Sequence, residues 1–233
     1  MTIDDRTIGE VYSRLREEGQ ATPYYGTLMV MAGLLAAVAL LTNSIPILIG
    51  AMLIAPALSP LALAALAVVL GRMSVAARAL GVAIGGIALA TVAAVLCTWM
   101  LDVAGIISDE ESLVIRALLE ERVRPGWYSA IAAVAAGIAG MLAILKNKSD
   151  TLVGTLAAVA LVPTAAAAGI ALKAGDPQRA LGGLALLSLN VVLIFAMAVL
   201  VLLVLGRGRR SAANHHADGS APASPSGKPP HPG

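Results

Sequence analysis

The fold of this chain is decided by residues 43–60, which read NSIPILIGAMLIAPALSP. Apolar residues fill the stretch, and prolines interrupt it at positions 46, 56 and 60. A proline has no amide hydrogen and clashes with the carbonyl four residues earlier, so Pro56 and Pro60 are expected to free the carbonyls of Met52 and Pro56. Ser59 followed by Pro60 is a favourable start for a new helix. The stretch therefore predicts an apolar helix that is broken near its middle.

The rest of the chain is also strongly apolar. Hydrophobic residues make up 58% of the 233 residues, charged residues 13%, and the mean hydropathy is +0.86. A helix needs ~20 apolar residues to cross a bilayer, whereas the strands of a membrane barrel alternate apolar and polar residues over ~10. The sequence therefore predicts an all-α polytopic membrane protein with about six transmembrane helices. The apolar runs are 25–41, 45–71, 79–101, 128–145, 151–172 and 180–206.

Polar segments divide the chain into five parts. In the connector between the halves, Ser108 to Glu111 form a capping box that predicts a short helix through about Arg122. The end of the chain is rich in Pro, Ser and Gly, a composition that cannot bury a core. We expect an amphipathic cytoplasmic segment at the membrane surface over 1–22, a first three-helix repeat over 23–101, an extracytoplasmic connector over 102–126, a second three-helix repeat over 127–206 and a disordered cytoplasmic tail over 207–233.

Two motifs at the same offset indicate a duplication of three helices. Asn43-Ser44 precedes Pro56 in the first half as Asp150-Thr151 precedes Pro163 in the second. Because each half has an odd number of spans, the second copy enters the membrane from the opposite face, which makes the repeat inverted. The second and fifth helices are then proline-broken, with Pro56 and Pro163 ~18 Å inside their segments. Many secondary transporters with inverted repeats bind substrate at such breaks near mid-membrane.

Lysine and arginine residues set the orientation. Most of the 16 lie in the N-terminal segment, the 72–78 and 146–148 loops and the tail, which share one side if all six runs span. The excess predicts a multi-pass protein of the cell membrane with both termini cytoplasmic. An alternative stays open, in which 45–71 and 151–172 are re-entrant hairpins. In that topology the excess of Lys and Arg on the cytoplasmic side is almost as large as with six spans. The repeats would then be parallel, as in a channel with two pore loops.

Polar residues within the apolar runs, together with the prolines and the carbonyls they free, form the candidate substrate-binding set. No Asp, Glu, His, Lys or Arg lies near the middle of a run, and Asp150 stands at an edge. Asn190 is the strongest outlier, because an amide in the last span needs a partner, either another helix or a ligand. The set comprises Asn43, Ser44, Met52, Pro56, Ser59, Pro60, Asp150, Thr151, Val159, Pro163, Thr164 and Asn190.

Enzyme chemistry and bound cofactors are not expected. The single cysteine, Cys97, lies inside an apolar run, and the three histidines lie in the tail. These residues supply neither a disulfide nor a zinc cluster. The sequence also has no nucleophile-base pair and no phosphate-binding loop, so no catalytic residue, metal or cofactor is predicted.

Residues 43–60 resemble the hallmark segment of a bacterial family of uncharacterised hydrophobic membrane proteins, catalogued as domain of unknown function 389. Ser149 to Gly154, running on to Leu161-Val162-Pro163, is similar to the second signature of that family, and Leu189-Asn190 to its last-span asparagine. The resemblance covers roughly residues 23–205. Thr164 departs from the family, which usually has a second proline there. The resemblance implies the membrane fold and brings no established activity.

The matched breaks favour a transporter or channel for a small solute or ion, with its site at the helix breaks near mid-membrane. The alternative is a non-transporting membrane scaffold or signalling subunit, favoured by the amphipathic segment, the tail and small-residue packing faces such as Gly81-x-x-x-Gly85. The scaffold predicts a closed interior with no cavity that reaches Asn190 or Ser59. The expected partners are the lipid bilayer, the solute or ion and, in a homo-oligomer, a second copy of the chain. Nucleic acid is not expected.

Overall fold

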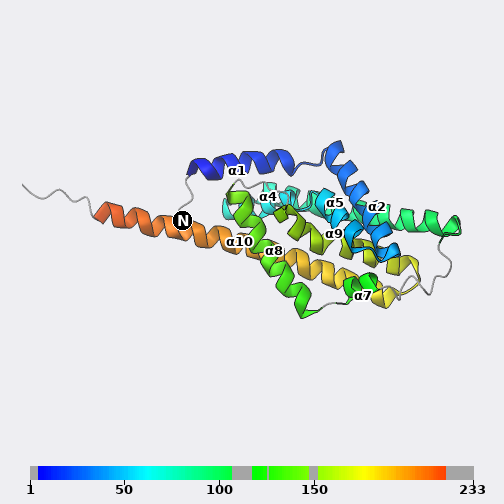
Figure 1. Ribbon diagram of the computed structural model, residues 1–233. Coiled ribbons are helices and arrows are strands. Elements are labelled where there is room, and N and C mark those ends of the chain that lie inside the picture. The colour runs from blue at the N-terminus through cyan, green and yellow to red at the C-terminus, as the bar shows by residue number, and fades with distance from the viewer. Residues whose placement is uncertain (1–4, 107–116, 125, 147–151, 219–233) are drawn as a thin grey trace, which may run out of the picture.

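The computed structural model describes residues 5–106, 117–124, 126–146 and 152–218, and within them every side chain except those of 5–7, 152–160 and 207–218. These ranges form helices joined by turns, with no strand among them. Figure 1 shows a bundle along the long helix α10, with α1 lying beside α4 and α8 crossing α10. The helices are α1 (Asp5–Glu18), α2 (Pro23–Thr42), α3 (Ile45–Ile54), α4 (Leu58–Val69), α5 (Met73–Val103), α7 (Ala117–Val123), α8 (Trp127–Leu145), α9 (Leu152–Lys173) and α10 (Pro177–Asp218).

The ends of α2 show how the local sequence sets a helix boundary. Thr22 accepts a hydrogen bond from the backbone N–H of Tyr25 at 3.1 Å, and Pro23 fills the first helical position, where an amide hydrogen would have no partner in the helix. At the other end Asn43 adopts φ 52°, a left-handed conformation that asparagine tolerates better than most residues. The local sequence therefore accounts for both boundaries of α2, with Thr22 and Pro23 at its start and Asn43 at its end.

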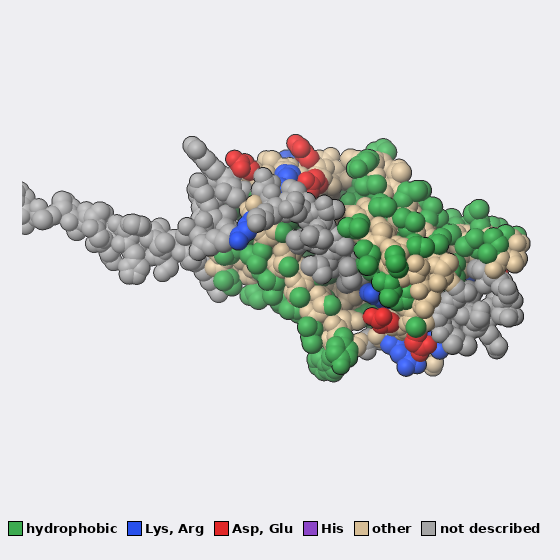
Figure 2. Space-filling model, in the orientation of Figure 1, with side chains coloured by type: hydrophobic (Ala, Val, Ile, Leu, Met, Phe, Trp, Pro, Cys, Tyr) green, Lys and Arg blue, Asp and Glu red, His purple; other side chains and the backbone are tan. Residues whose placement is uncertain are grey.

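Helix length and composition define the membrane-crossing elements. Four of the described helices are long and apolar enough to cross a bilayer: α2, α5, α8 and the Pro177–Gly206 part of α10. α3 and α4 together make a fifth candidate, whose two parts meet at an angle of 48°. The Leu161–Lys173 part of α9 is apolar but shorter. Figure 2 shows apolar side chains over much of the visible surface, as expected for a polytopic helical membrane protein.

The predicted break of the second helix is present, but the predicted break of the fifth is wrong. α3 ends at Ile54 and α4 begins at Leu58, whereas α9 continues through Pro163. Pro56 and Pro60 lie four residues apart, so the second proline also removes the amide that would bond the carbonyl of the first. At Pro163 only one such bond is lost, and residues 161–171 are all buried. Surrounding helices can hold a helix with a single proline in one piece.

α4 is largely buried in the fold. Its residues from Pro60 to Ala67 are all buried, and α1, α5, α9 and α10 pack around it. Alanine fills much of the surrounding core, so neighbouring helices approach one another closely. The break at the start of α4 therefore lies where several helices meet.

Two glycines allow direct backbone contact between helices. A Cβ atom on Gly33 would overlap the carbonyl oxygen of Ala90, which joins α2 to α5. A Cβ atom on Gly137 would stand 2.8 Å from the carbonyl oxygen of Ile194, which joins α8 to α10. Gly33 and Ala90 are as far apart in the sequence as Gly137 and Ile194. The two contacts are similar, although Gly33 and Gly137 are 104 residues apart and Pro56 and Pro163 are 107 residues apart.

α1 is helical and amphipathic. The sequence suggested that its apolar face lies on the membrane surface, but in the structure protein covers this face. Val11 and Leu15 are 4% and 1% exposed and belong to a cluster with residues of α4, α8 and α10. The Arg14 guanidinium donates to the carbonyl oxygen of Ile144, at the end of α8, at 2.9 Å. Because α4 and its neighbours already bury this face, α1 needs no bilayer to cover it.

Contacts between chain segments divide the helix ends into two groups. One group holds α1, the α4–α5 turn and the end of α8, since Arg72 lies 4.6 Å from the centre of the Tyr12 ring and Arg14 bonds the end of α8. The other group holds the α2–α3 turn, the end of α5, α7 and the α9–α10 turn. There Asn43 Oδ1 accepts a hydrogen bond from the backbone N–H of Leu118 at 3.1 Å, and ion pairs join α5 to α9 and α7 to α10.

Two predicted segments differ in extent from the structure. α10 continues as a helix to Asp218, past the predicted start of a disordered tail at 207, because extending an existing helix through arginine and alanine requires no new nucleation. Residues 219–233 lie outside the described residues. α7 lies within the segment for which a short connector helix is predicted, while the capping box from Ser108 to Glu111 lies outside the description.

Candidate binding site at the helix break

The break between α3 and α4 consists of residues 55–57. Ala55 is extended (φ −71°, ψ 115°), as a residue before proline prefers. α4 begins at Leu58 with an alanine as its N-cap, so the expected capping role of Ser59 is wrong, and Ser59 lies in the first turn. Pro60 fits the same turn, because the first four amides of a helix have no partner inside it. The carbonyl end of α3 and the amide end of α4 therefore meet at one place.

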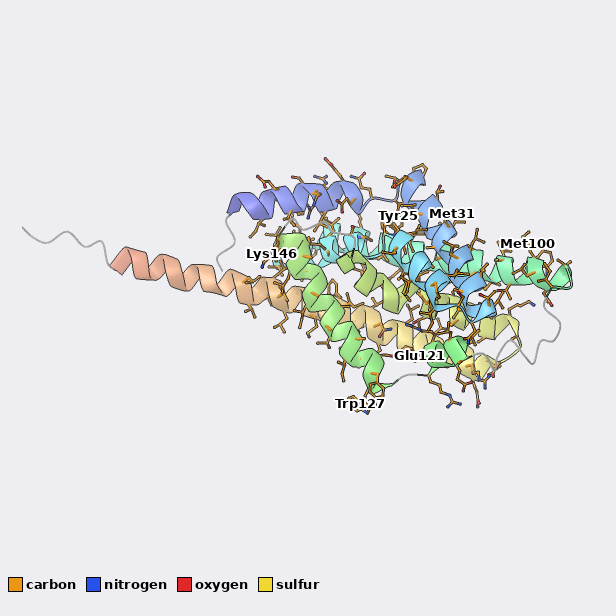
Figure 3. All side chains as sticks on the ribbon, in the orientation of Figure 1. Tyr25, Met31, Met100, Glu121, Trp127 and Lys146 are labelled. Carbon is orange, nitrogen blue, oxygen red and sulfur yellow. The ribbon has the colours of Figure 1, made fainter. Side chains whose placement is uncertain are left out.

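A pocket of about 350 Å³ opens beside this break. Its walls come from the end of α1, the start of α2 and the first turn of α4. Figure 3 labels Tyr25, which stands on the α2 wall near the end of α1. Carboxylates, hydroxyl groups and aromatic rings thus converge on a helix break. The lining residues are Glu17, Glu18, Thr22, Tyr24, Tyr25, Leu28, Pro56 and Ser59.

Glu18 connects α1 to the break. The Ser59 hydroxyl donates a hydrogen bond to Glu18 Oε2 at 3.0 Å. Because Ser59 lies in the first turn of α4, this carboxylate stands at the positive end of the α4 dipole. Arg14 is a weaker partner, with 3.9 Å between its Nε and Glu18 Oε1. The chain itself thus supplies an anion to the amide end of α4, and the additional carboxylate of Glu17 makes the pocket more favourable to a cation than to an anion.

The structure places the predicted residues of the first half at two separate ends of α3. Pro56 and Ser59 line the pocket, and Met52 and Pro60 are buried beside it. Asn43-Ser44 lies at the opposite end of α3, whose 10 residues span ~15 Å. There the Asn43 side chain bonds α7, and the Ser44 side chain makes no capping hydrogen bond to α3. Asn43 and Ser44 therefore do not belong to the same site as Pro56 and Ser59.

Among the described residues, the second half adds no side chain to this pocket. Thr164 of α9 is fully buried and Asn190 of α10 is 2% exposed. The Thr164 hydroxyl has no hydrogen-bond partner in the described part of the chain. Pro163 lies inside α9 and is buried. Asp150, Thr151 and the side chain of Val159 lie outside the described residues.

Sequence reasoning misses the part of the pocket that α1 and α2 supply. The pattern assigns Glu17 and Glu18 to a surface segment and Tyr24-Tyr25 to the start of a span. Glu18 stands 41 residues before Ser59, and nothing in that spacing indicates a contact. The one available signal is Thr22 before a proline, which fixes the start of α2 next to the end of α1.

A second polar cluster lies at the other group of helix ends. Lys173 of α9 forms an ion pair with Asp102 of α5, and both side chains are largely buried. Glu120 of α7 pairs with Arg124 at 2.6 Å and with Arg179 of α10 at 3.7 Å. These contacts join helix ends. In the ranges that the structure describes, no group of three or more His, Cys, Asp or Glu side chains is arranged to hold a metal ion.

α7 also carries a largely buried cation. Burial lowers the pKa of the Arg122 guanidinium, and the negative charge of neighbouring Glu121 raises it in part. The group lies on the connector helix, away from the pocket at the break. It is therefore not part of the candidate site.

The described helices are those of a polytopic helical membrane protein, with a pocket beside the break between α3 and α4. The chain belongs to the family described as "Domain of unknown function (DUF389)", whose sequence profile matches residues 52–196. A curated relative, an uncharacterised protein of Methanocaldococcus jannaschii, is 23% identical over 179 residues, which are 77% of this chain and 53% of the relative. This chain thus spans about half the length of that relative.

The relative comes from an archaeon, so the expected restriction of the family to bacteria is not supported. No solved structure matches the chain.

Proposed function

We propose that this protein carries a small ion or solute across the membrane, and that the pocket at the α3–α4 break is its binding site. The pocket itself carries the proposal: it opens at a helix break within a candidate span and is lined by Pro56, Ser59, Glu17 and Glu18. Irregular backbone at membrane depth is tolerated where it lines a cavity, and transporters place their sites at such breaks. Because of the two carboxylates, a small cation is the first substrate class to test.

The path of the chain supports a topology of six spans in two inverted three-helix repeats. From α2 to α10 the chain alternates between the two groups of helix ends, if α3 and α4 count as one element. α9 has 22 residues and is ~33 Å long, which is enough for the fifth span. The similar close contacts of α2 with α5 at Gly33 and of α8 with α10 at Gly137 support the repeat. With the excess of Lys and Arg on the α1 side, both termini are cytoplasmic.

Flux into liposomes tests the proposal. Purified protein in vesicles loaded with a potassium- or sodium-sensitive dye is expected to admit one of these cations faster than empty vesicles do. Ser59→Ala removes a hydroxyl group and Glu18→Gln a negative charge from the pocket, and both are expected to lower the flux several-fold. Glu10→Gln, an exposed position on α1, is the matched control and keeps the flux. Normal flux in both pocket variants would overturn the assignment of the site.

A non-transporting membrane scaffold or signalling subunit is the second candidate. The observation in its favour is the dense core around Thr164 and Asn190, which are 0% and 2% exposed. Ser59 lines an open pocket, which the scaffold does not require. Vesicles that show no flux of cations, anions or small neutral solutes, together with a stable partner in pull-downs, would favour the scaffold. An enzymatic role is not proposed.

A further inference from the structure

A groove of about 650 Å³ runs between the start of α2 and the first half of α5. It is separate from the pocket at the break, although Thr22 and Tyr25 border both. Both walls belong to helices that are long and apolar enough to cross a membrane, so the groove opens toward lipid. Its lining includes Pro23 and Gly26 from α2, and Arg78, Gly81, Gly85 and Leu89 from α5.

Glycines on α5 make room for the groove. A Cβ atom at Gly81 or Gly85 would meet no atom within 4 Å, so the space above these residues is open. The floor is Tyr25, which is 5% exposed and whose hydroxyl donates to the carbonyl oxygen of Val82 at 3.3 Å. A Cβ atom at Gly86 would overlap the Tyr25 ring, so the ring lies directly on α5. The result is a narrow apolar trough with a rigid base.

One end of the groove carries an unpaired cation. Arg78 is exposed and forms no ion pair or hydrogen bond with any other residue that the structure describes. Several other cations have partners: Lys173 and Arg179 are in ion pairs, and Arg72 lies on the Tyr12 ring. Arg78 follows the start of α5 at Met73 by five residues, about 8 Å along the helix axis. Arg78 thus lies in the first two turns of α5, the part of a membrane-crossing helix that is close to the lipid headgroups.

We propose that this groove binds an acidic phospholipid, with one acyl chain lying over Gly81, Gly85 and Leu89 and the phosphate on the Arg78 guanidinium. Charge complementarity supports this occupant, because a guanidinium binds phosphate with two parallel hydrogen bonds and Arg78 has no competing carboxylate among the described residues. The start of α5 is on the side of the N-terminal segment, and the cytoplasmic leaflet is the one rich in anionic lipid. The inference rests on membrane insertion and on the proposed cytoplasmic side of the N-terminal segment, and it does not rest on transport.

Native mass spectrometry of the full chain in detergent tests the groove, with phosphatidylglycerol and phosphatidylcholine of equal chain length as probes. The wild type is expected to bind phosphatidylglycerol about fivefold more tightly, the effect of one basic residue near an anionic headgroup. Arg78→Gln should bind both lipids equally. Gly85→Leu fills the open trough and should weaken both.

Two controls separate the groove from general surface effects. Gly50→Leu adds the same side chain at another open glycine, on α3, and Arg16→Gln removes an exposed arginine from α1. Both are expected to keep the wild-type preference, and glycerol phosphate without acyl chains is expected not to compete. Equal binding of the two lipids by the wild type, an unchanged preference in Arg78→Gln, or competition by glycerol phosphate would each overturn the proposal.

Discussion

Gly33 shows how a single hydrogen atom in place of a side chain sets the distance between two helices. α2 and α5 touch through the Gly33 Cα and the backbone of Ala90, and α8 and α10 repeat this contact at Gly137. An added methyl group there must push backbone atoms apart, because no flexible side chain can move out of its way. The close packing of α2 on α5 and of α8 on α10 thus depends on one glycine in each pair.

We expect Gly33→Ala and Gly137→Ala each to lower the free energy of unfolding by ~1–3 kcal/mol, the usual range for an overpacked core. For a chain of this size the apparent Tm in detergent should fall by roughly 5 °C. Gly50→Ala is the matched control: its added methyl meets nothing within 4 Å, and alanine favours the helix more than glycine does. A Gly33→Ala protein as heat-stable as the Gly50→Ala protein would contradict the contact.

Thr164 is a fully buried hydroxyl without a partner among the described residues. Burying an unpaired hydroxyl is unfavourable, so Thr164→Val is expected to leave the apparent Tm unchanged or to raise it, with a gain of up to ~1 kcal/mol. Thr98→Val is the comparison, because the buried Thr98 hydroxyl donates to the Ala94 carbonyl at 2.9 Å, and its loss should lower stability slightly. Stability that falls more in Thr164→Val than in Thr98→Val would show that Thr164 has a partner.

Among the helices, α1 is held to the bundle by its apolar face and by Glu18. α1 packs on α4, and Glu18 contacts the first turn of α4 next to the break, so α1 also forms one wall of the pocket. A helix of 14 residues is marginally stable alone, so α1 relies on this docking. Releasing α1 should therefore uncover Ser59.

We expect Leu15→Glu to release α1, because it places a carboxylate in an apolar cluster where Leu15 is 1% exposed. In a Cys97→Ala background, Ser59→Cys is expected to react with a water-soluble maleimide about tenfold faster after this release, since each ~1.4 kcal/mol of lost docking changes the open fraction tenfold. Arg16→Gln makes the same change in net charge on the exposed face of α1 and should leave the rate unchanged.

A second cysteine position distinguishes the release of α1 from unfolding of the whole bundle. Thr98→Cys in α5 is fully buried away from α1 and is expected to stay unreactive in the Leu15→Glu protein. Reaction at both positions would mean that the whole bundle had opened, and reaction at neither would mean that α1 does not cover the break.

The two prolines that were predicted to break helices, Pro56 and Pro163, had different outcomes because of their surroundings. Pro56 shares its helix with Pro60 and follows an extended alanine, so the chain breaks. Pro163 stands alone in a helix whose neighbours are all buried, and α9 remains continuous. The number of prolines is visible in the sequence, but the support given by packed neighbours is not.

At the scale of the whole molecule, the side of the membrane on which three exposed residues lie distinguishes the proposed six spans from re-entrant hairpins. Six spans place Glu10 and Lys146 on one side of the membrane and Ile106 on the other, whereas hairpins at 45–71 and 151–172 place Glu10 and Ile106 together. All three side chains are exposed. They therefore serve as positions for surface labelling.

We expect single cysteines at Glu10 and Lys146, in the Cys97→Ala background, to react with a membrane-impermeant thiol reagent only from the cytoplasmic side. A cysteine at Ile106 should react only from the outside. The measurement compares intact cells with inside-out vesicles. Reaction of Ile106→Cys on the same side as Glu10→Cys would reject the six-span topology and the inverted repeat with it.

The sequence by itself determined the helical membrane class, the family and the break at Pro56, because apolar run length and proline chemistry act locally. Only the tertiary structure decided that α1 docks on α4, that Glu18 meets Ser59, and that Asn43 lies ~15 Å from the pocket. Contacts of this kind join residues far apart in the chain, and they depend on which apolar face covers which neighbour. The apolar face of α1 could equally have covered lipid, and its burial against α4 was settled by packing alone.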